Sequence, residues 1–438
     1  MNPSANWTAL RALRSRNYRL FFTGQSISLI GTWMTRIATS WLIYRLTGSA
    51  LLLGVASFAG QIPAFFLAPI AGVWVDRWNR HRTLVVTQIL SMMQSFALAA
   101  LALSHRINIR WIVALVLCQG LINAFDMPSR QAFVVEMIEQ RGDLSNAIAL
   151  NSSIVNGARL IGPAIAGMVI AAVGEGYCFL IDGISYIAVI VSLLAMRLDR
   201  IESRRVEKRV LEELVEGWKY ITGSAAIRSI LLLLGLVSLI GMPYTVLMPI
   251  MAGHVLHGGA HTLGFLMAAS GVGALTSAIS LALRRTVVGL GKMIAISSGM
   301  FGVGLIVLAM SRNLWLSLPL MMITGFGMMQ QMAASNTILQ TIVEDDKRGR
   351  VMSFYTLAVL GISPIGSLGA GTFAAKFGAP ATLIVGGACC IAGSLWFVRE
   401  LPIIRHVIRP IYRQLGILPQ VAAGIESAAA LHTPPTDS

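Results

Sequence analysis

The sequence predicts an all-α membrane protein with twelve transmembrane helices in two pseudo-symmetric six-helix bundles. Three observations predict this fold class: a very apolar composition, twelve apolar segments of membrane-spanning length, and an internal repeat. Only 12% of the 438 residues are charged and the mean hydropathy is +0.72, whereas about a quarter of the residues of a soluble domain are charged. The chain is therefore expected to lie in a lipid bilayer.

Each of the twelve segments is long enough for a helix to cross the hydrocarbon core, which takes about 20 residues. Lipid cannot satisfy exposed backbone groups, so runs this long and continuous are helices and not barrel strands. A basic turn separates the second and third segments, and a charged joint separates the sixth and seventh. In order, the segments are residues 18–44, 51–75, 83–104, 111–131, 146–173, 178–197, 227–251, 261–283, 291–310, 315–336, 352–376 and 381–399.

The 34 Lys and Arg residues divide unequally between the two sides of such a bundle. Counted along the chain, 27 fall on the side of the N-terminus, five on the other side, and two, Arg36 and Arg159, inside segments. Basic loops stay in the cytoplasm, so we expect both termini there, in a bacterial-type inner membrane. The formal charge of +15 then favours contact with anionic membrane lipids and not with nucleic acid.

An internal repeat relates the two halves of the chain. Ser28-Leu-Ile-Gly31 recurs as Ser238-Leu-Ile-Gly241, and Gly54 meets Gly264 at the same offset of 210. Residues 162–174 align with 366–378 at an offset of 204. Parallel repeats of this kind place a binding site between the halves. The predicted parts are a cytoplasmic N-terminus (1–17), a first half (18–197), a linker with an amphipathic helix (198–226), a second half (227–399) and a partly disordered tail (400–438).

The turn between the second and third segments carries a specific motif. It reads Gly72-Val-Trp-Val-Asp76-Arg77-Trp-Asn79-Arg80-His81-Arg82. This layout resembles the G-x-x-x-D-R-x-G-R-R/K loop of major facilitator superfamily transporters, with Asn79 in place of the second glycine. The resemblance implies the major facilitator fold. It also implies a cytoplasmic gate in which the carboxylate meets the start of helix 11 near Arg350 to Ser353. The gate residues are Gly72, Asp76, Arg77, Arg80 and Arg82.

The fifth segment resembles the antiporter motif of facilitator exporters. The stretch from Asn156 to Gly167 is rich in small residues, which let helices approach closely, and its proline removes one backbone hydrogen bond. The resemblance rests on Gly162, Pro163 and Gly167. Helix packing alone is the alternative explanation for this motif, which comprises Gly157, Gly162, Pro163 and Gly167.

Three further stretches resemble the exporter branch that includes enterobactin and macrolide efflux proteins. They are Trp33-Met-Thr-Arg36, Leu46-Thr-Gly-Ser49 and Asp126-Met-Pro-Ser-Arg130. The resemblance implies a monomeric secondary transporter that exports a small drug-like or siderophore-like molecule by alternating access, with proton antiport. A lipid or lysolipid translocator of the same fold and a non-transporting membrane sensor remain open as alternatives.

Two arginines inside the bilayer are candidates for substrate binding, because buried charge is costly and marks function by default. With a rise of 1.5 Å per residue, Arg36 lies at the depth of Asp182, so a structural ion pair is one interpretation of these two residues. Arg159 has no partner at its depth. It either binds an anionic substrate group or bonds to backbone carbonyls, Asn151 or Asn156.

Two carboxyl groups inside the bilayer, Asp126 and Asp182, are candidates for proton coupling. Pairing with Arg130 or capping of the helix end is the alternative role of Asp126. Polar residues on helices 1, 4, 7 and 10 line the cavity in facilitators, which adds further candidates, for each of which interhelical bonding is the alternative. These are Gln25, Gln61, Asn123, Tyr244, Gln330, Gln331 and Tyr355.

Other chemistries find little support in the sequence. No nucleophile–base constellation and no phosphate-binding Gly-x-x-x-x-Gly-Lys motif is visible, so we expect neither an enzyme nor a cofactor. The spacing His254-x-x-His257-x-x-x-His261 has no carboxylate or thiolate close by in sequence, and we expect no metal site there.

Overall fold

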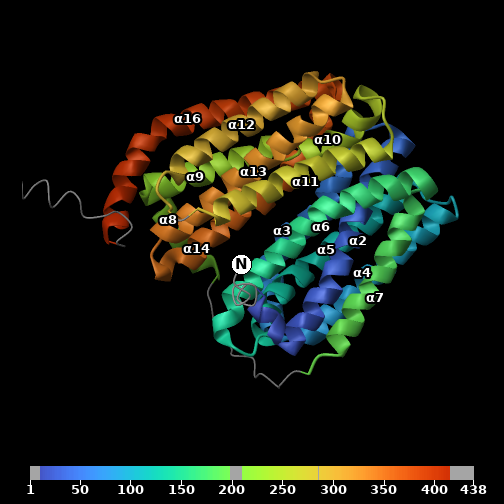
Figure 1. Cartoon of the computed structure of the whole chain (residues 1–438), viewed down its shortest axis with the longest axis horizontal. Coiled ribbons are helices and arrows are strands. Elements are labelled where there is room, and N and C mark those ends of the chain that lie inside the picture. Colours follow the sequence, from blue (N-terminus) through green and yellow to red (C-terminus); the bar gives the residue numbers. More distant parts are fainter. Residues whose placement is uncertain (1–9, 198–209, 285, 415–438) are drawn as a thin grey trace, which may run out of the picture.

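The computed structural model describes residues 10–197, 210–284 and 286–414 (Figure 1). The described part is built from helices and connecting turns, with no strand. The first half contains six long helices: α2 (Arg16–Thr47), α3 (Ala50–Arg77), α4 (Arg80–Leu103), α5 (Ile109–Phe133), α6 (Leu144–Val173) and α7 (Glu175–Leu194). Short 3-10 turns cover Arg11–Arg14 (η1), Val134–Met137 (η2) and Arg141–Asp143 (η3). The predicted all-α fold class is confirmed.

Polar side chains begin several of these helices. The Asn79 side chain accepts a hydrogen bond from the Arg82 amide and caps α4, and Asn108 caps α5 in the same way. Asparagine is among the residues preferred at this position, because it satisfies an amide that lacks a helical partner. Asn79, which replaces the second glycine of the basic turn, therefore sets where α4 starts.

The second half repeats the six-helix pattern with breaks in two helices. Its helices are α9 (Ala225–Leu236) with α10 (Tyr244–Ile250), α11 (Ala260–Ala282), α12 (Leu290–Met310), α13 (Leu314–Ile342), α14 (Asp345–Thr356) with α15 (Ser363–Phe377), and α16 (Ala379–Gln414). Widened π-helical turns at Val237–Gly241 (η4), Met251–Val255 (η5) and Leu357–Gly361 (η6) interrupt the first and fifth of these spans. Such bulges often occur at functional sites.

Ten spans in the described residues are apolar and long enough to cross a membrane. The two remaining long helices, α2 and α13, have 32 and 29 residues but carry more polar side chains, among them Gln25, Gln330 and Gln331. Both pack inside the bundles, α2 against α6 and α7, and α13 against α11 and α12. Their polarity reflects a position among other helices and not a place outside the membrane.

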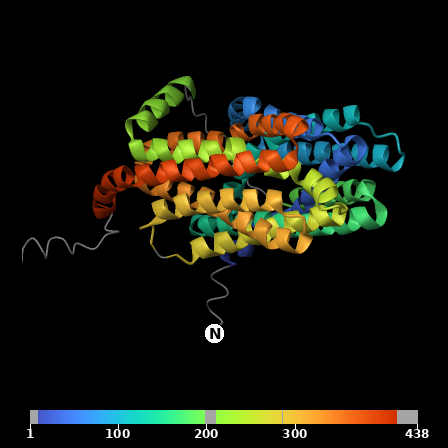
Figure 2. The same ribbon diagram turned by 90° about the horizontal axis from the view of Figure 1, so that it is seen from above.

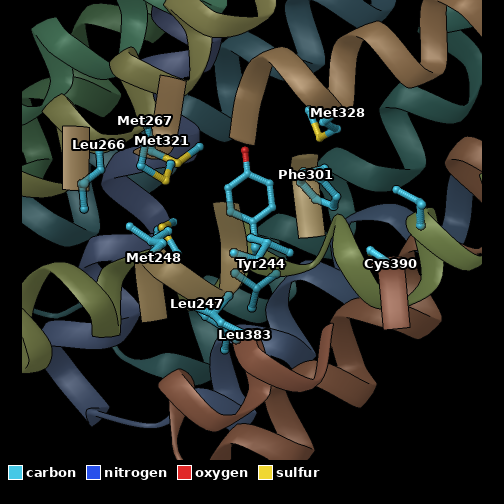
Figure 3. Packing of buried hydrophobic residues seen from close by; sticks show 14 of the residues in the cluster. Tyr244, Leu247, Met248, Leu266, Met267, Phe301, Met321, Met328, Leu383 and Cys390 are labelled. Atoms are coloured by element: carbon cyan, nitrogen blue, oxygen red, sulfur yellow. The ribbon is translucent and has the colours of Figure 1, made fainter. Parts of the chain in front are cut away.

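Buried aromatic and sulfur-containing side chains fill the centre of the second half (Figure 3). Tyr244 is 1% exposed, its ring meets Phe301 edge-on at 5.9 Å, and its hydroxyl is 2.8 Å from Ser270 Oγ. Met267, Met321 and Met328 surround it. Tyr244 therefore belongs to the packed core of this half in this conformation.

The halves touch through two glycine crossings near one end of the bundles, where α6 packs against α11 and α3 packs against α15. A Cβ on Gly264 of α11 would lie 2.8 Å from Cα of Gly167 on α6, and one on Gly371 of α15 would lie 2.9 Å from Cα of Gly54 on α3. Only glycine permits this approach. We call this the far end, marked by the turns at 47–50, 173–175 and 377–379, and its opposite the linker end, marked by residues 197 and 210.

The repeat in the sequence relates one crossing to the other. Gly54 corresponds to Gly264 at the offset of 210, and Gly167 corresponds to Gly371 at the offset of 204. The repeat also relates Gly174 and Gly378, which follow α6 and α15 with φ of 92° and 87°. The far end is thus closed by two copies of one contact. Figure 1 shows the bundles diverging from there towards the end that carries α8 and α14.

A helix from the linker docks on the linker end of the second half. α8 (Val210–Gly223) stands outside the bundles in Figure 2. Glu216 forms an ion pair with Arg350 of α14 at 2.8 Å, and Trp218 meets the ring of Phe354 at 6.1 Å. A helix is therefore present within the predicted linker, although its predicted start near Val206 lies outside the described residues. Its amphipathic character stays a prediction. The helix holds the first turns of the span that includes α14.

We expect Glu216→Gln to loosen α8 from α14 while leaving transport largely intact. The pair is partly exposed, so its loss costs about 0–1 kcal/mol, and we expect trypsin to cut the linker up to about fivefold faster. Limited digestion followed by mass spectrometry measures the rate. Asp345→Asn, which removes an exposed pair with Arg348 within α14, is the matched control and leaves the linker cuts unchanged. Equal rates in all three proteins would contradict the docking role.

Candidate functional site

Two arginines from different helices flank one indole ring in the first half. The Cζ atom of Arg36 lies 5.0 Å from the centre of the Trp33 ring, and that of Arg159 lies 5.8 Å from it. Both distances are in the range of cation–π attraction. Trp33 and Arg36 lie one turn apart on α2, and Arg159 comes from α6. The structure thus brings together the two arginines that the sequence singled out separately.

Gly162, which belongs to the predicted packing motif and lies on α6, makes this arrangement possible. A Cβ on Gly162 would collide with Cβ of Trp33 and with the carbonyl oxygen of Ile30, both on α2. Because Gly162 lacks a side chain, α6 approaches α2 closely at the level of the indole. Arg159, three residues earlier on α6, reaches the same ring as a consequence.

The other glycines of the motif have different surroundings. Gly167 forms the far-end crossing with α11, where a Cβ would also meet the backbone of His261 at 3.1 Å. Gly157 has no atom within 4 Å of its Cβ position. Two of the three glycines in the predicted packing motif, Gly162 and Gly167, therefore lie at close helix contacts, and Gly157 does not.

Neither arginine has an acidic partner within the described residues. Arg36 is exposed and Arg159 is half-buried, and the structure shows no ion pair and no hydrogen bond for either side chain in this part of the chain. The ion pair between Arg36 and Asp182 that the sequence allowed is wrong, because Asp182 is bonded elsewhere. The described residues thus contain two neighbouring guanidinium groups without acidic partners, and guanidinium groups are donors of the kind that hydrogen-bond carboxylates.

Asp182 is buried and accepts hydrogen bonds from two hydroxyl groups. Its Oδ2 accepts hydrogen bonds from Thr35 at 2.9 Å and from Ser95 at 2.8 Å, while Oδ1 has no partner in the described residues. The side chain is on α7, is 1% exposed, and has no ion pair with a cation in the part of the chain that the structure describes. A proton can therefore bind Asp182 without breaking an ion pair.

Asp126 has the opposite surroundings. It is 2% exposed and forms an ion pair with Arg130 one turn along α5. Thr87 and Gln88 of α4 donate to its Oδ1 at 2.9 and 2.7 Å. The pairing with Arg130, which the sequence left open as an alternative, is confirmed. Protonation of Asp126 would break this ion pair.

Most of the remaining polar candidates are tied to their own half of the protein. Gln61 donates to Ser57, Asn123 accepts from Gln119, Tyr244 meets Ser270, Gln330 meets Ser277, and Tyr355 donates to the Met332 carbonyl. The buried Gln331 side chain has no partner for either amide atom in the described residues. Gln25 is buried as well. Their role as substrate contacts stays a prediction.

The basic turn is described only in part. Arg80 forms an ion pair with Glu136 at 2.7 Å, and the exposed Arg82 gives its amide to the α4 cap. The side chains of Gly72, Asp76 and Arg77 lie outside the described residues. Arg350, near which we expected the Asp76 carboxylate, is paired with Glu216 here. The gate stays a prediction.

Comparison with known proteins identifies the family to which this chain belongs. A family model described as transmembrane secretion effector matches residues 7–407. The chain belongs to this family. It is 26% identical to the staphyloferrin A transporter of Staphylococcus aureus (87% of this chain, 96% of that protein) and 25% identical to the multidrug efflux pump Tap of Mycolicibacterium fortuitum (81% and 88%). It is 22% identical to macrolide efflux protein A of Streptococcus pyogenes (86% and 95%).

The fold itself is that of solved major facilitator transporters. The chain superposes on a bacterial homologue of the human lysosomal transporter Spinster with a TM-score of 0.63, over 91% of this chain and 98% of that one, at 15% identity. The expected family and fold are confirmed. This transmembrane secretion effector is a multi-pass membrane transporter of the major facilitator type.

Trp33 is the site residue that the sequence does not single out. In the sequence it belongs only to the stretch that resembles the exporter branch. The signal available was its spacing of three from Arg36, which puts both on one helix face. The contribution of Arg159 to the same ring depends on how α2 and α6 cross, which the sequence does not reveal.

Proposed function

We propose that this transporter exports a small, anionic, drug-like or siderophore-like molecule, bound at Arg36, Trp33 and Arg159. The observation that carries the proposal is the pair of arginines without acidic partners around one indole. Guanidinium groups bind carboxylates through two parallel hydrogen bonds, and an indole face accepts a flat apolar group. Relatives named for siderophore transport and drug efflux support this substrate class.

The proposed direction follows from the charge distribution. With the basic linker end in the cytoplasm, both termini are cytoplasmic, and the glycine crossings close the outer face. The structure then represents an inward-facing state, in which substrate enters from the cytoplasm between the diverging bundles. Export requires the Gly167–Gly264 and Gly54–Gly371 crossings to separate while the linker end closes.

Protons are the proposed coupling ion, with Asp182 as the carrier. The Asp182 carboxylate accepts a hydrogen bond from Thr35, and Thr35 is the residue before Arg36 on α2. Asp182 is therefore linked directly to the helix that carries the proposed site. Proton binding there changes the hydrogen bonds of Thr35 and Ser95 and so links protonation to the position of α2. Asp126, held by Arg130, is assigned a structural role.

We expect Asp182→Asn to bind substrate nearly as well as the parent protein but to lose the response of transport to a pH gradient. The amide fits the same hydroxyl partners and cannot take up a proton. Efflux from loaded vesicles with and without an imposed gradient measures this. Asp126→Asn is the matched control: it leaves Arg130 without its partner, lowers the melting temperature, and retains the gradient response. Loss of the response in Asp126→Asn alone would transfer the coupling role to that residue.

Transport of matched compounds tests the function directly. Everted membrane vesicles that contain the protein are expected to accumulate a carboxylate-bearing aromatic compound faster than its neutral amide. Vesicles without the protein provide the background rate. Equal rates for the acid and the amide would reject the anionic substrate class, and movement of a labelled lysolipid alone would favour the translocator alternative.

A further inference from the structure

A cavity lies at the far end, away from the arginine–indole site. It has a volume of about 620 Å³, opens to the surface, and is lined by both halves of the protein. Ser49 and Ala50, where α3 begins, come from the first half, while His254, His257, Arg312 and Ala379 come from the second. The cavity therefore spans the closed contact between the bundles, next to the crossing of Gly54 with Gly371.

The ionisable side chains that line this cavity are all basic. They are the exposed side chains of His254, His257 and Arg312, and the described residues of the lining include no carboxylate. Glu175, the acid at the start of α7, is held by Arg45 at 2.8 Å. Arg312 makes one long bond, to the Ala309 carbonyl at 3.4 Å. Glu175 is therefore paired with Arg45 and does not neutralise the three basic side chains of the cavity.

The backbone that carries the histidines is fixed in an unusual conformation. His257 has φ of 50°, in the left-handed region that few residues other than glycine adopt. The turn is held by hydrogen bonds from the Leu256 amide to the Met251 carbonyl at 2.9 Å and from Gly258 to Ala252 at 2.8 Å. Strained backbone persists where surrounding structure enforces it, often at ligand sites. Here it keeps His257 at the cavity wall.

We propose that this cavity is an inhibitory site for a small polyanion such as a di- or tricarboxylate, which enters from the face opposite the linker. Arginine and protonated histidine donate charge-assisted hydrogen bonds to carboxylates, and the starts of α3 and α16 add partial positive charge. An anion bound here contacts both halves only while they are together. Because the anion binds the closed far end more tightly than the open one, it stabilises the closed state and slows the opening of the far end. This proposal rests on the proposed topology, in which that face is extracellular.

Citrate is the probe, and the Arg159→Ala background weakens the binding of carboxylates at the arginine–indole site. We expect purified protein in nanodiscs at about pH 6 to bind citrate in a calorimeter. In that background, Arg312→Gln and His257→Gln should each weaken binding about tenfold or more. Lys376→Gln, an exposed cation at the same end that does not line the cavity, is the matched control and changes affinity little.

Two results would overturn the proposal. One is absence of citrate binding in the Arg159→Ala background, and the other is unchanged affinity in both Arg312→Gln and His257→Gln. In vesicles of the otherwise unchanged protein, citrate on the far-end side should slow transport, and Arg312→Gln should relieve this slowing. Inhibition that persists in Arg312→Gln would also count against it. Failure of the proposed transport function would appear separately, as unchanged transport in Arg159→Ala.

Discussion

We expect Arg159→Ala to bind the anionic substrate about 10- to 150-fold more weakly, because a hydrogen bond to a charged group contributes about 1.5–3 kcal/mol. Arg36 alone supplies one guanidinium group where the substrate previously met two. The substitution also removes repulsion between two cations on one indole, so the melting temperature should stay level or rise. Equilibrium binding and initial efflux rates measure the two effects on substrate.

Charge and shape at position 159 can be separated. Arg159→Lys keeps the positive charge but loses the planar group that binds carboxylates in two places and stacks on the ring, so it should recover part of the lost affinity. A neutral amide analogue of the substrate should bind the parent protein and Arg159→Ala with similar affinity. An equal loss for acid and amide would show that Arg159 shapes the cavity and does not bind an anion.

The helices were predictable from the sequence because membrane length and backbone satisfaction leave few alternatives. The first and tenth predicted segments fall within α2 and α13, despite their polar residues. The breaks were not predictable. The turns η4 and η6 depend on packing around Gly241 and Gly361, where a Cβ would meet Phe301 or Phe65 from another helix. Such contacts are set by tertiary structure and not by periodicity.

The sequence allowed most residues of the site to be predicted, but not which of their side chains contact one another. Depth along a helix correctly placed Arg36 and Asp182 at one level, but depth says nothing of the direction in which a side chain points. Thr35, the residue next to Arg36, is the one that meets Asp182. Arg36 is left to share Trp33 with Arg159. Rotation of a helix about its axis, which packing decides, therefore determined which residues of the candidate list belong together.

We expect Gly167→Leu to impair closure of the far end and to reduce transport about 5- to 150-fold, because overpacking a close contact costs about 1–3 kcal/mol. A Cβ at Gly167 already lies 3.0 Å from both the Ala260 carbonyl oxygen and Gly264 Cα. The added side chain cannot fit unless α6 and α11 separate. Gly157→Leu is the matched control on the same helix, since nothing lies within 4 Å of its Cβ position, and it should transport normally.

Labelling of a cysteine at position 50 distinguishes a gate from a folding defect. Ala50 is 5% exposed at the far end, so an impermeant maleimide should label Ala50→Cys slowly in the parent protein and faster when Gly167→Leu is added. Because the repeat makes Gly371 the counterpart of Gly167, Gly371→Leu should raise labelling to a similar degree from the other crossing. Faster labelling in only one of them would mean that the crossings open independently and not as one rigid motion of the halves.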